Sequence, residues 1–128
     1  MFHALPPSAE TELRARLAKI ANSSLPKASV EGLMDLDGGV AFRVVTADLD
    51  RIREELAADL HGLLGAQDSG GWRPHVTVQN KVAPKQSRAL IRALEEGFVP
   101  RPLAISGLGL YRYLGGPWEC ITTYAFRG

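Results

Sequence analysis

The chain has 128 residues, of which 45% are hydrophobic and 23% charged, and its formal net charge is +1. This length is typical of one domain, or of two small lobes that share a core, and a chain of this size folds without a metal or a disulfide. The near-neutral charge excludes a protein that coats duplex nucleic acid through a broad basic surface, but it allows a local anion site.

This sequence has few potential metal ligands and no long apolar run. One cysteine, Cys120, and three histidines are present, so an internal disulfide is excluded and no zinc-binding spacing occurs. No stretch approaches the roughly 18 apolar residues of a membrane span, and the N-terminus lacks the basic start and apolar run of a signal peptide. We therefore expect a cytoplasmic protein with no metal, no cofactor and no membrane association.

Hydrophobic spacing and turn residues predict a regular order of elements in the first half. Pro6 and Pro7 stop a short strand, and Gly38 and Gly39 form a tight turn between two further strands. The expected elements are a strand at 2–5, a helix capped by Ser8, strands at 29–36 and 40–45, and a helix capped by Thr46.

A flexible glycine-containing loop at 65–71 precedes the second half, in which a similar order returns. The expected elements there are a strand at 75–81, a helix opened by Pro84, and strands at 103–113 and 118–126. The fold class that follows is α+β, with two pseudo-symmetric β-α-β-β lobes and mostly antiparallel sheets around a central cleft, with helices outside. The single bilobal domain 1–128 divides into lobe one at about 1–64 and lobe two at about 72–128.

The spacing of punctuating residues favours an internal duplication. Pro7 and Pro84 lie 77 residues apart, and Gly38 and Gly115 share the same separation. The alternative is that any two α/β units carry similar prolines and glycines at their boundaries. Agreement in register between the two kinds of landmark favours a true repeat.

The segment Pro74-His75-Val76-Thr77-Val78 carries the most specific chemistry in the sequence. Residues two apart on a strand share a face about 7 Å apart, so His75 and Thr77 point together while Val76 and Val78 are expected to enter a core. An imidazole titrates near neutral pH and can transfer protons, and a threonine hydroxyl can hold a phosphoryl oxygen. The alternative is an ordinary amphipathic strand with one surface histidine.

This motif, followed by a helix and a closing hairpin, resembles the two-histidine (2H) phosphoesterase superfamily, which includes 2'-5' RNA ligase-like proteins and RNA cyclic phosphodiesterases. The resemblance implies two facing His-x-Thr/Ser strands that act without metal on 2',3'-cyclic or 2'-5' phosphodiesters of RNA or small nucleotides. By the same resemblance, His75 is a general acid or base and Thr77 a phosphate ligand. The partner is then an RNA terminus or a small nucleotide.

The sequence departs from the family pattern at its N-terminus. The 77-residue offset maps Thr77 to position 0 and His75 to −2, both before Met1. We expect either a truncated form or a family member that lost one histidine, with impaired turnover in both cases. His3 maps to the other strand face and is expected to be a surface histidine rather than a replacement. An unpaired N-terminal strand edge would favour a homodimer.

Three further residues are candidate substrate-binding groups. Arg43 and Arg73 can meet a phosphate or face solvent, and Tyr113, with Tyr111 and Trp118, can stack on a base or pack the hairpin. Two other functions remain open on the sequence. One is a non-catalytic module that binds a nucleotide or RNA end, and the other is a ferredoxin-like regulatory domain in which the histidine is incidental.

Overall fold

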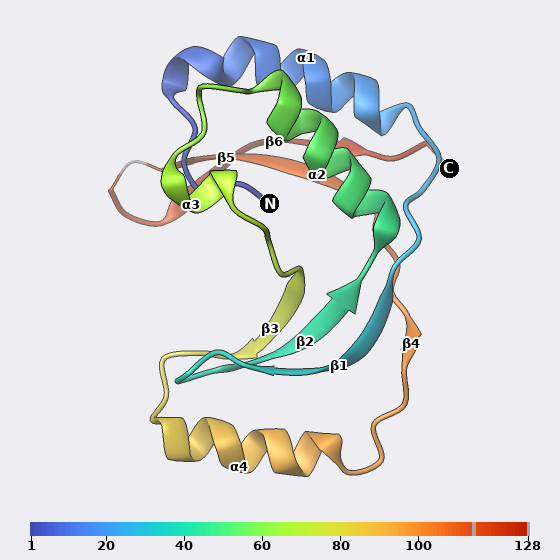
Figure 1. Cartoon of the computed structure of the whole chain (residues 1–128), viewed down its shortest axis with the longest axis vertical. Coiled ribbons are helices and arrows are strands. Elements are labelled where there is room, and N and C mark those ends of the chain that lie inside the picture. Colours follow the sequence, from blue (N-terminus) through green and yellow to red (C-terminus); the bar gives the residue numbers. More distant parts are fainter. Residues whose placement is uncertain (114, 128) are drawn as a thin grey trace.

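The computed structural model describes residues 1–113 and 115–127 and arranges them as two sheets with helices on their outer sides (Figure 1). A 3-10 turn at Pro7–Ala9 leads into α1 (Glu10–Ala21), and the other helices are α2 (Ala47–Asp59), α3 (Ala66–Ser69) and α4 (Pro84–Glu95). The strands are β1 (Ser29–Asp35), β2 (Val40–Val45), β3 (His75–Gln79), β4 (Arg101–Pro102), β5 (Gly107–Tyr113) and β6 (Trp118–Ala125). The α+β class expected from the sequence is confirmed.

All strand pairs in the two sheets are antiparallel. The larger sheet has the order β3-β2-β1-β4, and the smaller sheet consists of β5 and β6. Between β1 and β2 the chain reverses through Asp37 (φ 55°) and Gly38 (φ 116°), and a positive φ is accessible at low cost mainly to glycine, asparagine and aspartate. The predicted tight turn is confirmed, and it brings Gly39 against the backbone of β3.

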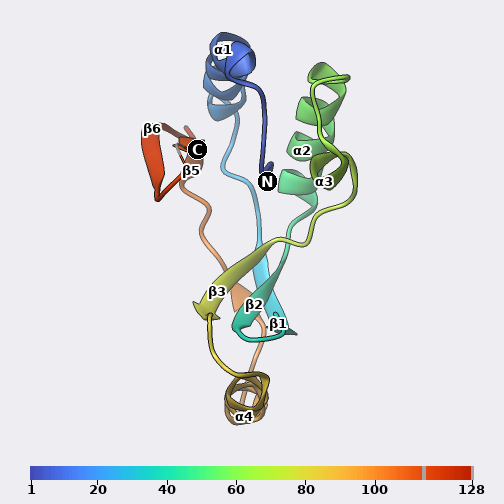
Figure 2. The same cartoon turned by 90° about the vertical axis from the view of Figure 1, so that its left-hand side faces the viewer.

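Each sheet is covered by a helix from the opposite half of the sequence. Helix α4 packs against β1 and β2, whereas α1 packs against β5 and β6. Phe98, just after α4, stacks on Phe42 of β2 with ring centroids 6.1 Å apart. Figure 2 shows α4 below the larger sheet and α1 above the smaller one. The packing therefore crosses the sequence division at about residues 64–72.

The main core lies between α1, α2 and the β5–β6 hairpin. Its buried members are Leu17, Leu49, Ile52, Leu56 and Phe126. Leu49, Ile52 and Leu56 repeat at helical spacing along α2, and this apolar stripe packs with Leu17 of α1 and Phe126 after β6. Thr46 caps α2 as predicted, because its hydroxyl oxygen accepts a hydrogen bond from the Leu49 amide at 3.2 Å.

Three predictions from the sequence are wrong. Residues 2–5 form no strand, because the backbone amides of His3 and Ala4 donate to the Asp68 carboxylate and not to a neighbouring strand. Ser8 lies inside the 3-10 turn and makes no cap bond. The strand expected at 103–113 begins only at Gly107, since the short strand β4 precedes it and pairs with β1.

Candidate functional site

Strand β3 lies at the edge of the larger sheet and pairs only with β2. His75 stands directly opposite Arg43, and Thr77 stands opposite Ala41. Residues directly opposite in an antiparallel pair point to the same face. His75, Thr77 and Arg43 therefore share one face, as the sequence predicted for the first two. Both β3 side chains are exposed.

Strand alternation identifies this face as the one without a helix. Phe42 and Val76 oppose each other across β2 and β3, and Phe42 contacts Phe98 next to α4. The neighbours Arg43 and His75 must then point away from α4. We call this surface of β2 and β3 the helix-free face of the larger sheet.

The ring orientation of His75 is fixed by its own loop. Its Nδ1 lies 2.7 Å from the carbonyl oxygen of Arg73, and a carbonyl oxygen only accepts, so Nδ1 carries the hydrogen. In the neutral ring, Nε2 then has a free lone pair that can accept a proton. The backbone of the preceding Pro74 is held too, because its carbonyl oxygen accepts from the Val44 amide at 3.0 Å.

Arg43 provides a positive charge beside His75. Its guanidinium lies over Gly32, where a Cβ would come within 3.5 Å of Nη2, and Nη2 donates a long 3.4 Å hydrogen bond to the Glu31 carbonyl. Within residues 1–113 and 115–127, no carboxylate forms an ion pair with Arg43. A guanidinium with unused donors can bind an oxyanion.

Gln79 continues the His75–Thr77 row toward the hairpin turn. It pairs with Val40, and its side-chain oxygen is buried with no hydrogen-bond partner among the described atoms. A buried acceptor without a donor is costly, and such groups concentrate where a ligand or water completes the bonding.

The expectation that Val76 and Val78 enter a core is wrong. These side chains remain 44% and 46% exposed. They point to the side of the sheet that carries α4, but the main contacts of α4 are with β1 and β2. The His75-Val76-Thr77 motif therefore lies on an edge strand whose side chains are mostly exposed.

Arg73 and Tyr113 are the other expected binding residues, and neither lies on β3. Arg73 is exposed, and the contact that the structure assigns to it is the backbone bond to His75. Tyr113 lies on β5 in the smaller sheet, beside Trp118 with ring centroids 4.9 Å apart.

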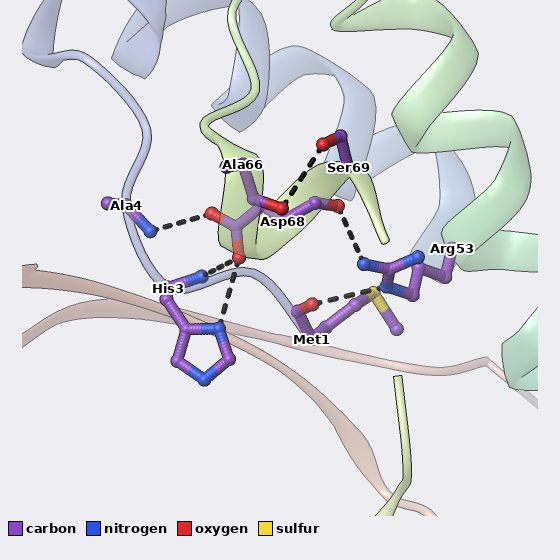
Figure 3. Close-up of polar contacts among 7 residues, drawn as sticks. All are labelled: Met1, His3, Ala4, Arg53, Ala66, Asp68 and Ser69. Atoms are coloured by element: carbon purple, nitrogen blue, oxygen red, sulfur yellow. Dashed lines mark hydrogen bonds and ion pairs between the residues drawn. The ribbon is translucent and has the colours of Figure 1, made fainter. Parts of the chain in front are cut away.

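A polar cluster around the buried side chains of Asp68 and Arg53 was missed by sequence reasoning (Figure 3). Asp68 accepts from the His3 amide (2.7 Å), the His3 Nδ1 (3.0 Å) and the Ala4 amide (2.8 Å). Burial acts to raise the pKa of the Asp68 carboxyl, but the hydrogen bonds from Ala4 and His3 outweigh it and hold this pKa below its usual value.

Arg53 connects the Asp68 cluster to Trp72, in the segment that leads into β3. It is 8% exposed, donates to the carbonyl oxygens of Met1 and Asp68, and lies over the rings of Phe2 (4.9 Å) and Trp72 (6.0 Å). Trp72 also donates from Nε1 to Asp50. The sequence did indicate that Arg53 faces the core, since it lies four residues after Leu49 on the apolar stripe of α2. Nothing in the 65–71 loop marked Asp68.

The fold and the strand site together define a class: an α+β protein whose exposed His-x-Thr strand presents a proton-transfer group, a hydroxyl and a guanidinium on one sheet face. Residues 1–117 match the family model described as the 2'-5' RNA ligase superfamily, and the chain belongs to this family of 2H phosphoesterases. A search of the curated proteins finds no match.

Two negative observations concern only the part of the chain that the structure describes. In residues 1–113 and 115–127, no three His, Cys, Asp or Glu side chains are grouped so that they would hold a metal ion. Within the same ranges, no helix combines the length and apolar character needed to cross a membrane.

Proposed function

We propose that the protein is a 2H-type phosphoesterase that acts on 2',3'-cyclic or 2'-5' phosphodiesters of RNA or small nucleotides. The observation that carries the proposal is the orientation of the His75 imidazole ring. Its Nδ1 is engaged by the Arg73 carbonyl oxygen, which leaves Nε2 free on the helix-free face. Family membership supports this substrate class, and the free Nε2 of His75 supports the proton-transfer role.

The proposed chemistry uses three side chains of this face. For a 2',3'-cyclic phosphate, water attacks phosphorus and one ribose oxygen leaves. Nε2 of His75 takes the proton of the attacking water or, when protonated, gives a proton to the leaving oxygen. Thr77 donates its hydroxyl hydrogen to a non-bridging oxygen, and Arg43 offsets the negative charge that develops on the phosphoryl oxygens.

A complete reaction needs both a proton acceptor and a proton donor, and the motif of β3 provides one of them. Loss of one general acid or base typically slows a reaction about a hundred- to ten-thousand-fold. We therefore propose that this chain binds its substrate and turns it over slowly. We further propose a cytoplasmic location for the protein.

Hydrolysis of 2',3'-cyclic nucleotides by the whole chain tests the proposal. His75→Ala should abolish turnover, whereas His61→Ala should leave it unchanged, because His61 is exposed beyond the end of α2. Turnover that survives His75→Ala rejects the catalytic assignment. Binding of the nucleotide without turnover in the unsubstituted chain favours the non-catalytic module, and absence of both favours the regulatory domain.

A further inference from the structure

The β5–β6 hairpin exposes three large aromatic side chains. Tyr111 is 51% exposed, Tyr113 58% and Trp118 53%. Burial of such side chains against the protein is favourable, and a contiguous exposed group of them marks a binding surface more often than a scattered one does.

The three rings are arranged as a surface and not as separate projections. Tyr113 and Trp118 are cross-strand partners whose ring centroids lie 4.9 Å apart at an interplanar angle of 31°. The Tyr111 ring lies against the strand over Gly109, where a Cβ would come within 2.6 Å of it. The absence of a side chain at Gly109 therefore lets the Tyr111 ring lie down on the sheet.

These rings occupy the face of the hairpin that carries no helix. On β5, Leu108 and Leu110 pack into the cores beside α1 and α2, and Arg112 donates to Glu10 of α1 at 2.9 Å. Alternation then turns Tyr111 and Tyr113 the opposite way. In Figure 1, α1 and α4 lie on the outer sides of the two sheets, so the two helix-free faces are turned toward each other.

We propose that Tyr111, Tyr113 and Trp118 form a stacking surface for an unpaired base of a single-stranded RNA whose phosphodiester lies at His75. This inference rests on the proposed function and narrows its substrate class to oligoribonucleotides. The surface itself is uncharged, whereas Arg43 is on the facing sheet, so rings and charge are separated as bases and phosphates are in a single strand. Stacking on aromatic side chains is the common way in which proteins bind unpaired RNA bases.

Binding of a short fluorescent single-stranded oligoribonucleotide with a 3'-phosphate end tests the surface by anisotropy. The His75→Ala background is used so that affinity does not depend on turnover. Tyr113→Leu and Trp118→Leu should each weaken binding about ten- to hundred-fold. Tyr113→Phe keeps the ring and should bind normally, and Val99→Ala, at an exposed apolar residue between α4 and β4, is the matched control.

An oligonucleotide with abasic sites should bind the unsubstituted surface as weakly as the intact RNA binds the leucine variants. Equal affinity for the abasic and intact RNA, or unchanged affinity in both leucine variants, overturns the inference. A self-association seen by sedimentation that Tyr113→Leu abolishes also overturns it, because the occupant is then a second copy of the chain. Aromatic-dependent binding, together with no turnover by the chain that retains His75, removes the proposed function and leaves the stacking surface standing.

Discussion

At the scale of single residues, Asp68 is bound on both carboxylate oxygens. It is 1% exposed, and Oδ1 and Oδ2 together accept from two backbone amides and one imidazole. A hydrogen bond to a charged group contributes about 1.5–3 kcal/mol, and an unsatisfied buried donor adds a further cost. This carboxylate keeps the N-terminal segment against α3 and thus close to the approach of β3.

Asp68→Asn should lower the free energy of unfolding by about 2–3 kcal/mol at pH 7, because the amide nitrogen cannot accept a hydrogen bond. His3→Ala is the matched control with a smaller expected loss, since its backbone amide still donates to the carboxylate. Urea unfolding measures both variants. An Asp68→Asn effect no larger than that of His3→Ala would show that the backbone contacts contribute little.

The Asp68 carboxylate should also make the free energy of unfolding depend on pH in the acid range. Its pKa is held below the usual value in the folded chain, so its contribution is complete above the unfolded-state pKa of about 3.9 and is lost as pH falls through the lower folded-state value. The stability difference between wild type and Asp68→Asn should therefore be constant above about pH 5 and shrink below about pH 4. Urea unfolding of both proteins across this range measures it, and a pH-independent difference contradicts the assignment.

Gly39 controls the position of β3, the strand that carries His75. A Cβ at this residue would lie 2.4 Å from the Gln79 carbonyl oxygen and 3.0 Å from the Asn80 Cα, both backbone atoms. Gly39→Ala must therefore displace the end of β3, with an expected loss of about 1–3 kcal/mol and reduced turnover. Gly70→Ala meets nothing within 4 Å and is the control. Equal unfolding midpoints in urea for the two variants would contradict the close approach.

At the scale of elements, the N-terminal cap of α2 depends on a single side chain, Thr46. The Thr46 hydroxyl accepts from the Leu49 amide and donates to the Lys27 carbonyl at 2.8 Å, so one side chain joins the helix start to the chain before β1. Thr46→Ala should cost about 1–2 kcal/mol by thermal or urea unfolding. Ser8→Ala should be neutral, because Ser8 makes no cap bond at α1. A comparable loss in both variants would refute this distinction.

Elements that depend on local patterns were predictable, and those that depend on distant partners were not. Thr46, the Gly38 turn and the Pro84 helix start carry their own signals within a few residues, and each is found as predicted. The strand expected at 2–5 fails because the side chain of Asp68, 65 and 64 residues away, binds the amides of His3 and Ala4. The site divides in the same way: alternation predicts that His75 and Thr77 share a face, whereas the Arg73 carbonyl bond that orients His75 depends on loop geometry.

At the scale of the whole molecule, the exchange of helices between halves makes each half incomplete. Residues 1–64 contain β1 and β2 without the helix that covers them, and α1 without the hairpin on which it packs. A sheet and a helix stripe that expose their apolar faces lose the hydrophobic contribution that stabilises both. The two halves are thus expected to fold as one cooperative unit despite their repeated pattern.

Cleaving the chain in the loop before β3 tests this dependence. Fragments 1–71 and 72–128 should each show weak circular dichroism and no cooperative urea transition alone, because each lacks the helix or the hairpin that its partner supplies. Mixed at equal concentration, they should recover the far-ultraviolet spectrum of the intact chain and a concentration-dependent transition. The Thr46→Ala fragment should reassociate more weakly, which links recovery to native packing. A cooperative transition in fragment 1–71 alone would show that the first half is an independent domain and that the crossed packing of α1 and α4 adds little to stability.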